Sequence, residues 1–417
     1  MKIAYIHDEN KLRTGADHIT ELIVKKLREH NVFVKNVYPK TRLIEYSHSI
    51  QLKGVSNILF FYSLLEQKDE ILKYDLIQGT TFTPITFLSF DIPVVTYFGS
   101  TSDGILFATP KTKHLKKSLR DILNQLKTDK VISRLDIKSV KPLQDISDIQ
   151  NFAASKSTRV IAASKIVKNN LVKYGKIHPN KIVVIHNAIE DYWFKKPIAK
   201  LGEPKLIFLG RIGADVFTWK TKGFDRLIKI YQLFPKMQKI SLLMTRNNKI
   251  DLWMNKSISN HKLFLNVSKK QIPDILHLER GSICLLTSRY EGFSLSLVEA
   301  MSQGIIPISY SVGIAPEIIV NGKNGYLVSS IKEAKARIKE ILKSDKLRTD
   351  LSYNAYKTST KFRADILAKK LVILYEGITG KKVKKLSSKK RTQIGERLIN
   401  NKINKTQINS NFELARD

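Results

Sequence analysis

The stretch from Gly281 to Val328, GSICLLTSRYEGFSLSLVEAMSQGIIPISYSVGIAPEIIVNGKNGYLV, carries the pattern that decides the fold. Its apolar run over 282–287 predicts a buried strand, and the residues from about Ser294 to Gln303 are expected to form a helix. Gly304 follows, as expected of a glycine that closes a helix. A strand leading through a short loop into a helix is the repeating unit of an α/β domain.

The start of this helix is a predicted anion site. Gly292, Phe293, Ser294 and Leu295 present backbone N–H groups at the helix N-terminus. Free donors and the positive end of the helix macrodipole both favour negative charge there. A pyrophosphate would fit, so these four residues are candidates for binding the phosphates of a ligand.

Two glutamates border this anion site. Glu291 lies in the loop, and Glu299 follows eight residues later in the first turns of the helix. Because carboxylates repel a phosphate, both should face hydroxyl groups, which sugar rings on the two sides of a pyrophosphate supply. From the residues alone, two alternatives stay open. Ser296 and Glu299 also match a capping box, and Glu291 can be a solvated loop residue.

The same stretch resembles the C-terminal donor site of glycosyltransferase family 4 (glycosyl transferases group 1). The family pattern is S-x-x-E-G-F-x-x-x-x-x-E-A-M-x-x-G-x-P, then G-x-x-P-E-I-I and N-G-x-L-V. The matching residues are Ser288, Glu291-Gly292-Phe293, Glu299-Ala300-Met301, Gly304, Pro307, Gly313, Pro316-Glu317-Ile318-Ile319 and Asn324-Gly325-Tyr326-Leu327-Val328. The resemblance implies an α/β protein of the GT-B type, with two Rossmann-like domains facing across a cleft.

A second block, LIFLGRIGADVFTWKTKGFDRLI, places Arg211 at a strand end and Lys222 just before a helix. It resembles the family's GR…KG element, although two ordinary surface cations are the alternative. Arginine can grip phosphate oxygens with two hydrogen bonds and lysine acts as a point charge, so both can bind one diphosphate. The resemblance implies that Arg211, Lys222 and Glu291 are catalytic, with Glu291 orienting the donor sugar and Glu299 holding the ribose.

Further residues of the donor site follow from the resemblance. KLFLNV resembles the strand end that binds the nucleobase, which puts Asn266 and Val267 nearest the base, although Asn266 stands where glycine is common. Gly15 resembles part of a glycine-rich loop that covers the donor phosphates. Many members carry a histidine after the strand PVVT, but here Phe98 has that position, and Asp103 is a candidate partial substitute.

Strands and helices alternate along the whole chain, which indicates parallel sheets covered by helices on both faces. The predicted strands are 2–6, 32–37, 75–78, 93–98, 159–163, 181–185, 205–210, 240–245, 262–267, 282–287, 305–310 and 325–328. The polar segment KPIAKLGEP over 196–204 interrupts this alternation and marks the domain boundary.

Four parts of the chain are therefore expected. An N-terminal Rossmann-like acceptor domain covers 1–196, and a C-terminal Rossmann-like donor domain covers 205–362. A helix over 363–380 is expected to return to the N-terminal domain. The last segment, 381–417, is a basic tail with eleven Lys and Arg against three Asp and Glu, and its polar composition predicts no packed core.

Composition limits the function classes. The chain has 417 residues and a formal net charge of +35, which predicts an anionic partner unless many lysines are simply solvated. The single cysteine, Cys284, suits a reducing compartment. The opening MKIAYIHDEN lacks a signal-peptide pattern, and no apolar run approaches the ~20 residues of a spanning helix. We expect a cytoplasmic protein and favour peripheral binding to the inner face of the cell membrane.

The segment 111–130 allows two interpretations. An apolar stripe of Leu115, Leu119, Ile122 and Leu126 is surrounded by lysines and Arg120. The stripe can pack a helix on its own domain, or it can dock on anionic lipid or a polyanionic glycan.

The predicted function is transfer of a hexose or N-acetylhexosamine from a nucleotide sugar, UDP favoured, to a cell-envelope or other glycan, glycolipid or protein acceptor. The resemblance implies retention of configuration without a metal or other cofactor, and no clustered metal-ligand pattern argues for one. A GT-B sugar phosphorylase or epimerase is one rival. A non-catalytic protein that binds an anionic ligand or nucleic acid is the other, but no module for specific nucleic-acid recognition is visible.

Overall fold

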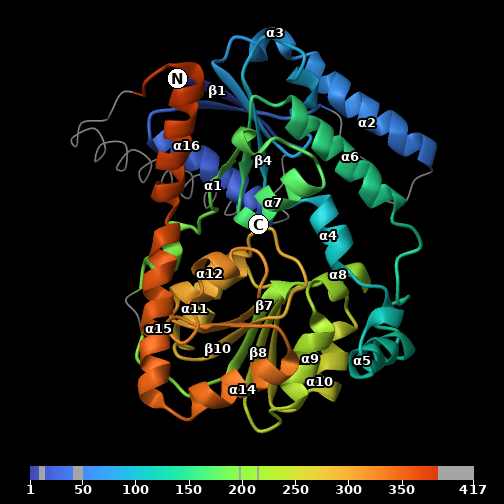
Figure 1. The fold of residues 1–417 in the computed structure, drawn as a ribbon, viewed down its shortest axis with the longest axis vertical. Helices are drawn as coiled ribbons and strands as arrows, with labels where there is room; N and C mark the ends of the chain where they lie inside the picture. The colour runs from blue at the N-terminus through green and yellow to red at the C-terminus, as the bar shows by residue number, and fades with distance from the viewer. Residues whose placement is uncertain (9–14, 41–49, 197–198, 214–215, 384–417) are drawn as a thin grey trace, which may run out of the picture.

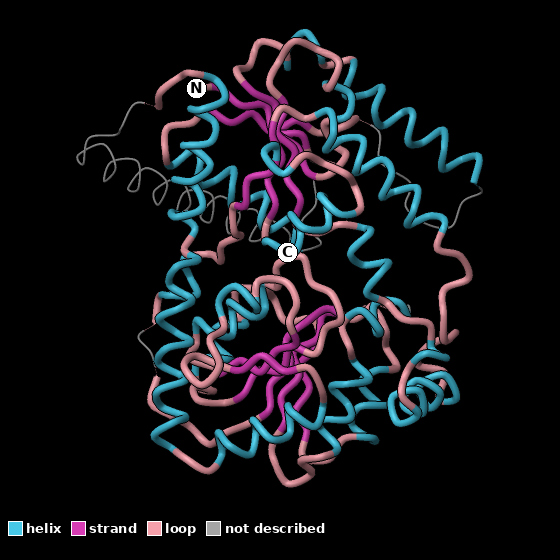
Figure 2. The backbone as a smooth tube through the Cα atoms, in the orientation of Figure 1, coloured by secondary structure: helices cyan, strands magenta, loops and turns pink. Residues whose placement is uncertain are grey.

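The computed structural model describes residues 1–8, 15–40, 50–196, 199–213 and 216–383. They form two α/β lobes, one above the other in Figure 1, and each lobe has a six-stranded parallel sheet between layers of helices (Figures 1 and 2). All twelve predicted strands are present. The predicted architecture of two Rossmann-like domains is therefore confirmed.

The N-terminal lobe has the strand order β2-β1-β3-β4-β5-β6. Its strands are β1 (Lys2–Ile6), β2 (Phe33–Val37), β3 (Leu76–Thr80), β4 (Val94–Phe98), β5 (Arg159–Ala162) and β6 (Ile182–Val184). The helices that cover them are α1 (Gly15–Glu29), α2 (Ile50–Leu65), α3 (Lys68–Ile71), α4 (Ser102–Ala108), α6 (Lys141–Lys156) and α7 (Lys165–Lys173). All five residues of β4 are buried, as a strand with helices on both faces requires.

The C-terminal lobe has the order β12-β11-β10-β7-β8-β9. Its strands are β7 (Leu206–Arg211), β8 (Lys239–Met244), β9 (His261–Leu265), β10 (Ile283–Leu286), β11 (Ile306–Tyr310) and β12 (Tyr326–Val328). Its helices are α8 (Val216–Thr221), α9 (Phe224–Gln232), α10 (Ile250–Ser257), α11 (Ile272–His277), α12 (Leu295–Ser302), α13 (Ala315–Ile318), α14 (Ile331–Leu342) and α15 (Asp345–Ser359).

The strand order determines where a ligand can bind. In the C-terminal sheet, β7 lies between β8 and β10, so the chain direction across the sheet reverses there. Open α/β sheets bind ligands beyond the carboxyl ends of their strands at such a point. The residues after β10 contact the residues after β4, so the carboxyl ends of the two sheets face each other. The loop that follows β10 therefore lies at the interface between the two lobes.

The last described helix, α16 (Ala364–Thr379), belongs spatially to the N-terminal lobe. It runs along α1 at the left of Figure 1. The buried Tyr375 hydroxyl donates a hydrogen bond to Gln78 of β3, and Lys381 pairs with Asp75 at 2.5 Å. The chain thus passes from the N-terminal to the C-terminal lobe near Pro204 and returns near Phe362.

One helix that lies within the N-terminal part of the chain packs on the C-terminal lobe instead of its own. Helix α5 (Lys117–Thr128) packs against α9, and Ile122, Leu123 and Leu126 join the C-terminal hydrophobic core (Figure 1). Polar contacts fasten the segment further, since Lys220 of α8 pairs with Asp136 at 2.5 Å. The apolar stripe of 111–130 is therefore a packing surface, but packing on its own domain was a wrong prediction. Periodicity identifies an apolar face and not its partner.

Truncation of one of these buried side chains tests the packing of α5. Leu123→Ala removes a fully buried side chain and should lower the free energy of unfolding by about 2–5 kcal/mol, because a cavity remains. Urea denaturation followed by tryptophan fluorescence measures this, since Trp219 and Trp253 lie in the same core. The exposed neighbour Asn124, changed to Ala, is the control. Equal stability of both variants would contradict the packing.

Candidate active site

The loop after β10 is held against the N-terminal lobe. Gly292 approaches Gly99 so closely that a Cβ on Gly292 would lie 1.9 Å from the Gly99 carbonyl oxygen. The Ser164 hydroxyl donates a hydrogen bond of 2.5 Å to the Gly292 carbonyl. Any other residue at 292 would push the lobes apart, so glycine is required by the space available.

Glu291 and Lys222 meet directly. Lys222 Nζ donates to Glu291 Oε1 at 2.8 Å, and the Ser288 hydroxyl donates to the same oxygen at 2.7 Å. Both charged side chains are largely buried, with 27% of Lys222 and 11% of Glu291 exposed. Glu291 is therefore not a solvated loop residue. Low exposure strengthens this ion pair relative to one at the surface.

Lys222 is positioned by its backbone. Thr287, next to the end of β10, donates its hydroxyl to the Lys222 carbonyl at 3.1 Å. Gly223 follows with a φ of 61°, and a Cβ there would lie 1.9 Å from the Thr287 carbonyl oxygen. A glycine is therefore required after Lys222, because only a residue without a side chain lets the backbone at 222–223 pack against the end of β10.

Arg211 lies at the same edge of the sheet. It is the last residue of β7, the neighbour of β10, and its side chain is exposed. Among the described residues, none forms an ion pair or hydrogen bond with its guanidinium group. The structure therefore brings Lys222 and Glu291 together and leaves Arg211 nearby but separate from both.

The start of α12 has the features of an anion site. The amides of Gly292, Phe293, Ser294 and Leu295 donate no hydrogen bond to any described residue. The N-cap is Ser294, whose φ of 78° is uncommon for a residue with a side chain. Ser296 lies inside the helix, so the capping-box alternative was wrong. Gly304 follows the helix with a φ of 69°, as predicted.

Glu299 belongs to a buried charged cluster that the sequence did not predict. Lys269 Nζ lies 3.5 Å from Glu299 Oε1 and 2.7 Å from Glu190 Oε1. Glu299 Oε1 and Glu190 Oε2 are buried and have no hydrogen-bond partner among the described residues. Buried polar atoms normally have a partner. These two oxygens therefore have unused acceptor capacity, and hydrogen bonding of Glu299 to a ribose stays a prediction.

The protonation of this cluster is shifted by its environment. Burial raises the pKa of Glu299 to about 7, and negative Glu190 adds to this while Lys269 opposes it. Burial also raises the pKa of Tyr192, with help from the two carboxylates. The pKa of His18 is lowered by burial and by the positive Lys269. One uncompensated negative charge is thus costly here.

Asn266 has a structural role at the end of β9. Its backbone has a φ of 52°, a left-handed conformation that glycine and asparagine adopt most easily, which explains why asparagine can replace glycine. Its side-chain oxygen accepts a hydrogen bond of 2.9 Å from the amide of Thr245. Val267 is half-buried beside it. Both residues lie at the sheet edge where the base was predicted.

Three N-terminal assignments have different outcomes. Gly15 is the first residue of α1, but 9–14, most of its loop, lie outside the described residues. Phe98, which stands at the position of the family's histidine, is fully buried in the core under α6 and α7 and does not line the site. Asp103 does not replace a histidine in the site, because its carboxylate accepts a hydrogen bond of 3.1 Å from Asn151 of α6.

Two residues that join the lobes were not predicted as site residues. The Tyr290 hydroxyl accepts a hydrogen bond from the Thr101 amide at 3.1 Å and lies 3.4 Å from Asn170 of α7. Glu317 accepts from the Lys165 amide at 2.7 Å and pairs with His186 at 3.1 Å. Glu317 stands in the motif P-E-I-I and Tyr290 next to Glu291, so motif positions were the available signal. Within the described ranges, no cluster of His, Cys, Asp and Glu could hold a metal.

The raised pKa of Glu299 gives a stability prediction. A carboxyl with a folded pKa near 7 and an ordinary value when unfolded favours folding at low pH, and this contribution disappears as pH rises through 7. Glu299→Gln cannot ionise. The free energy of unfolding should therefore fall more steeply between pH 5 and pH 8 in the wild type than in this variant. Urea midpoints across that interval measure the difference, and parallel curves would contradict it.

Comparison with known proteins shows the class of enzyme and the fold. Residues 189–358 match the family model described as Glycosyl transferases group 1. An uncharacterized glycosyltransferase of Methanocaldococcus jannaschii is 23% identical over 352 residues, which cover 82% of this chain and 88% of the relative. The sucrose-phosphate synthase structure from Thermosynechococcus elongatus has a TM-score of 0.68 at 15% identity, covering 91% of this chain and 99% of that one.

A second solved structure is the Anabaena protein HepE in complex with UDP and glucose. It has a TM-score of 0.61 at 17% identity and covers 90% of this chain and 100% of its own. At these identities the two structures establish the fold, and the family model and the relative establish the class of enzyme. Residues 189–358 match the glycosyl transferases group 1 family, and the chain is a glycosyltransferase with the GT-B fold.

Proposed function

We propose that this enzyme transfers a hexose or N-acetylhexosamine from a nucleotide sugar, most favourably a UDP-sugar, to a glycan, glycolipid or protein acceptor of the cell envelope or elsewhere, with retention of configuration. The observation that carries the proposal is the Lys222–Glu291 pair, which lies beside the four unbonded amides before α12. This arrangement offers positive charge to a diphosphate and a carboxylate to a sugar.

The residues have distinct roles in the proposed reaction. The acceptor oxygen bonds to the anomeric carbon while the bond from that carbon to the diphosphate oxygen breaks. Both events take place on one face of the sugar, and a leaving phosphate oxygen takes the acceptor's proton. Arg211, Lys222 and the α12 amides stabilise the growing charge on the diphosphate. Glu291 orients sugar hydroxyls, and Glu299 accepts from the ribose.

The preference for UDP rests on similarity. HepE, which shares the fold, has been solved with UDP and glucose. In this chain, Asn266 and Val267 lie at the end of β9, one strand away from the end of β8 and two from Arg211. A nucleoside extending from the diphosphate along this edge would pass the Glu299 cluster before the base reaches Val267. No metal or other cofactor is part of the proposal.

Two substitutions test the proposed catalytic pair. Lys222→Ala and Glu291→Ala should each lower turnover at least about tenfold, because a charge-assisted contact contributes about 1.5–3 kcal/mol. Nucleotide release from UDP-, GDP- and ADP-sugars measures turnover, and thermal denaturation verifies folding. The exposed Lys236, changed to Ala, is the control. Wild-type rates in either folded variant would remove that residue from the mechanism.

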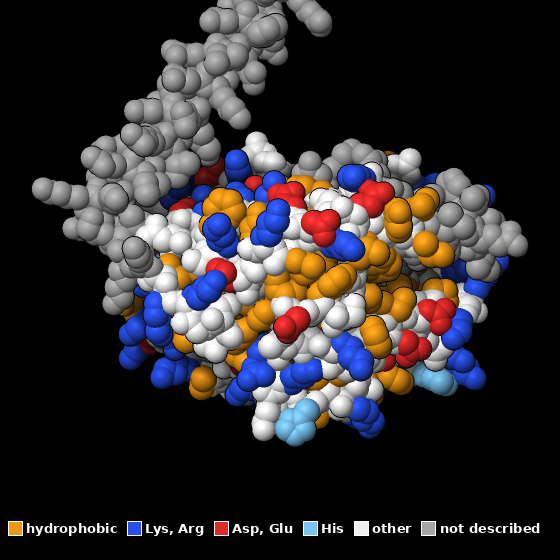
Figure 3. Space-filling model, turned by 90° about the horizontal axis from the view of Figure 1, so that it is seen from above, with side chains coloured by type: hydrophobic (Ala, Val, Ile, Leu, Met, Phe, Trp, Pro, Cys, Tyr) orange, Lys and Arg blue, Asp and Glu red, His pale blue; other side chains and the backbone are white. Residues whose placement is uncertain are grey.

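We further propose that the enzyme associates with an anionic membrane surface. None of the described helices is long and apolar enough to cross a membrane. With the α5 stripe buried, the apolar contribution comes from α2, where Ile58 and Tyr62 are 68% and 57% exposed. Figure 3 shows hydrophobic side chains between Lys and Arg on this end of the molecule. Basic residues near such a surface contribute about 1 kcal/mol each.

Sedimentation with vesicles tests this association. Binding should increase with the anionic lipid content of the vesicles and decrease with salt, because screening weakens attraction. Ile58→Asp should reduce binding, whereas Leu252→Asp should not, since Leu252 is also well exposed, at 76%, but lies on α10 of the other lobe. A bound fraction that does not change with the anionic lipid content, or equal binding by both variants, would contradict the proposal.

A further inference from the structure

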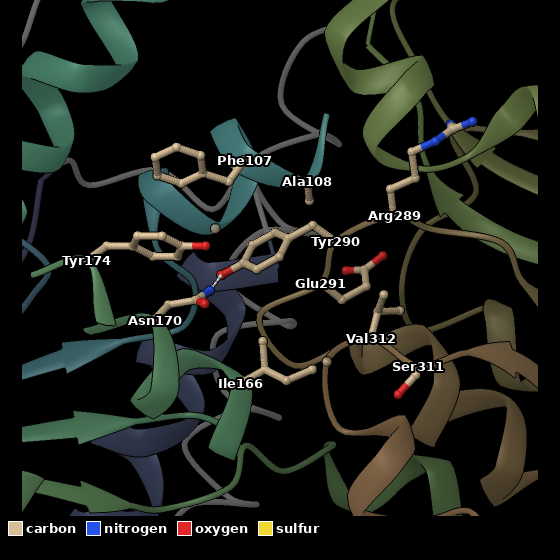
Figure 4. Close-up of a pocket in the computed structure, with 12 residues that line it drawn as sticks. Phe107, Ala108, Ile166, Asn170, Tyr174, Arg289, Tyr290, Glu291, Ser311 and Val312 are labelled. Atoms are coloured by element: carbon tan, nitrogen blue, oxygen red, sulfur yellow. Dashed lines mark hydrogen bonds between the residues drawn. The ribbon is translucent and has the colours of Figure 1, made fainter. Parts of the chain in front are cut away.

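A pocket of about 230 Å³ opens between the lobes beside Glu291 (Figure 4). One wall comes from α4 and α7 of the N-terminal lobe, and the other from the loops after β10 and β11. The lining residues are Gly104, Phe107, Ala108, Ile166, Asn170, Tyr174, Arg289, Tyr290, Glu291, Ser311, Val312 and Gly313. Because both lobes contribute, the pocket depends on the contacts that join them, including those of Tyr290 with Thr101 and Asn170.

The N-terminal wall presents an aromatic surface. Phe107 stacks on Tyr174 with ring centroids 4.5 Å apart and an angle of 20°, and 62% of Phe107 is still exposed. An exposed phenyl ring with a second ring behind it gives a firm, flat apolar surface. The C–H face of a pyranose ring can lie on such a surface, while the hydroxyls at the ring edge remain free to hydrogen-bond.

Polar groups lie at the opposite end of the pocket. In Figure 4, the Glu291 carboxylate lies near Val312 and away from Phe107. Both hydrogen bonds to Glu291 go to Oε1, and among the described residues Oε2 accepts none. The guanidinium group of Arg289 points away from the pocket and is bound by the buried Asp225 at 2.7 and 2.6 Å. The pocket is thus not a phosphate site.

The pocket is largely separate from the predicted nucleotide-binding residues. Of that set, which includes Arg211, Lys222 and Glu299, only Glu291 lines the pocket. Its volume is below the ~300–1,000 Å³ typical for drug-sized ligands, so it suits one sugar ring and not a nucleotide sugar. Glu291 is therefore where a ligand in the pocket and a donor bound at α12 would meet.

We propose that this pocket binds the terminal pyranose ring of the acceptor, with its C–H face on Phe107 and its edge hydroxyls toward Glu291. The proposal rests on the proposed glycosyl transfer. Tyr174 acts through Phe107 as a support, and Tyr290 closes the pocket by joining the lobes. A hydroxyl held at the Glu291 end is close to the donor sugar, so stacking on Phe107 selects which hydroxyl reacts.

Binding of simple glycosides tests the site without requiring turnover. The probes are methyl α- and β-glycosides of glucose, galactose, mannose and N-acetylglucosamine, which carry no aromatic group of their own. Saturation-transfer NMR titrations give dissociation constants for the wild type, Phe107→Ala and Phe152→Ala. Phe152 is the matched control, since it is 51% exposed on α6 and does not line the pocket.

At least one glycoside should bind the wild type, and Phe107→Ala should weaken that binding about fivefold, as expected for the loss of one aromatic contact. Phe152→Ala should bind as the wild type does, and UDP affinity, measured by calorimetry, should be equal in all three proteins. No glycoside binding to the wild type, or equal binding by Phe107→Ala, would overturn the proposal. A higher KM for the UDP-sugar in Phe107→Ala would also overturn it, by assigning the pocket to the donor sugar.

The glycosyl-transfer proposal fails by a different result. Failure to bind or turn over any nucleotide sugar would contradict glycosyl transfer, whatever the result for glycoside binding to the Phe107 pocket. Failure to bind any glycoside would contradict the acceptor site alone. The two readouts therefore separate a wrong acceptor site from a wrong function.

Discussion

The site depends on the close approach of one loop to the opposite lobe. Gly292 packs on the backbone of Gly99, Ser164 bonds to its carbonyl, and the neighbouring Tyr290 is inserted between α4 and α7. These contacts fix the backbone on both sides of Glu291. Without these contacts, the position of the Glu291 carboxylate would be defined relative to the C-terminal lobe only. With them, Glu291 is positioned relative to ligands of both lobes at once, as precise group transfer requires.

The two halves of the site differ in their electrostatics. Near α12, unbonded amides, Lys222 and the exposed Arg211 provide an excess of positive character for a dianionic group. Around Glu299, two carboxylates share Lys269 in a buried space, and two of their oxygens lack a hydrogen-bond partner among the described residues. A nucleotide would neutralise the first region and hydrogen-bond the second. The unbound protein thus carries costs at both places that ligand binding can remove.

The secondary structure and much of the site could be predicted from local patterns. All twelve strands follow from apolar runs, and Gly304 ends α12 as a glycine at that position should. Lys222 and Glu291 were each predicted as site residues from two motifs that are far apart in the chain, because each motif carries its own backbone requirement. Their direct ion pair was not predicted. Lys269 was missed, since nothing in its local sequence indicates that it lies between two glutamates.

Other features of the structure depend on the direction in which a side chain points. Phe98 and Tyr97 are neighbours in β4, and both are buried, so the sequence does not reveal which one points toward the site. Only the register of the sheet decides this, and it turns Phe98 into the core beneath α6. The stripe of α5 is similar. Its periodicity shows an apolar face, but its partner proved to be the other lobe.

By itself, then, the sequence determined the class of fold, the strand positions, and the glycines and charged residues that a diphosphate site requires. These depend on local propensity and on backbone geometry within a few residues. The tertiary structure alone decided that α5 packs on the C-terminal lobe, that Lys269 lies between Glu190 and Glu299, and that Phe107 and Glu291 share a pocket. Such relations join residues far apart in the chain, and packing and loop closure fix them, because no short segment records its distant neighbours.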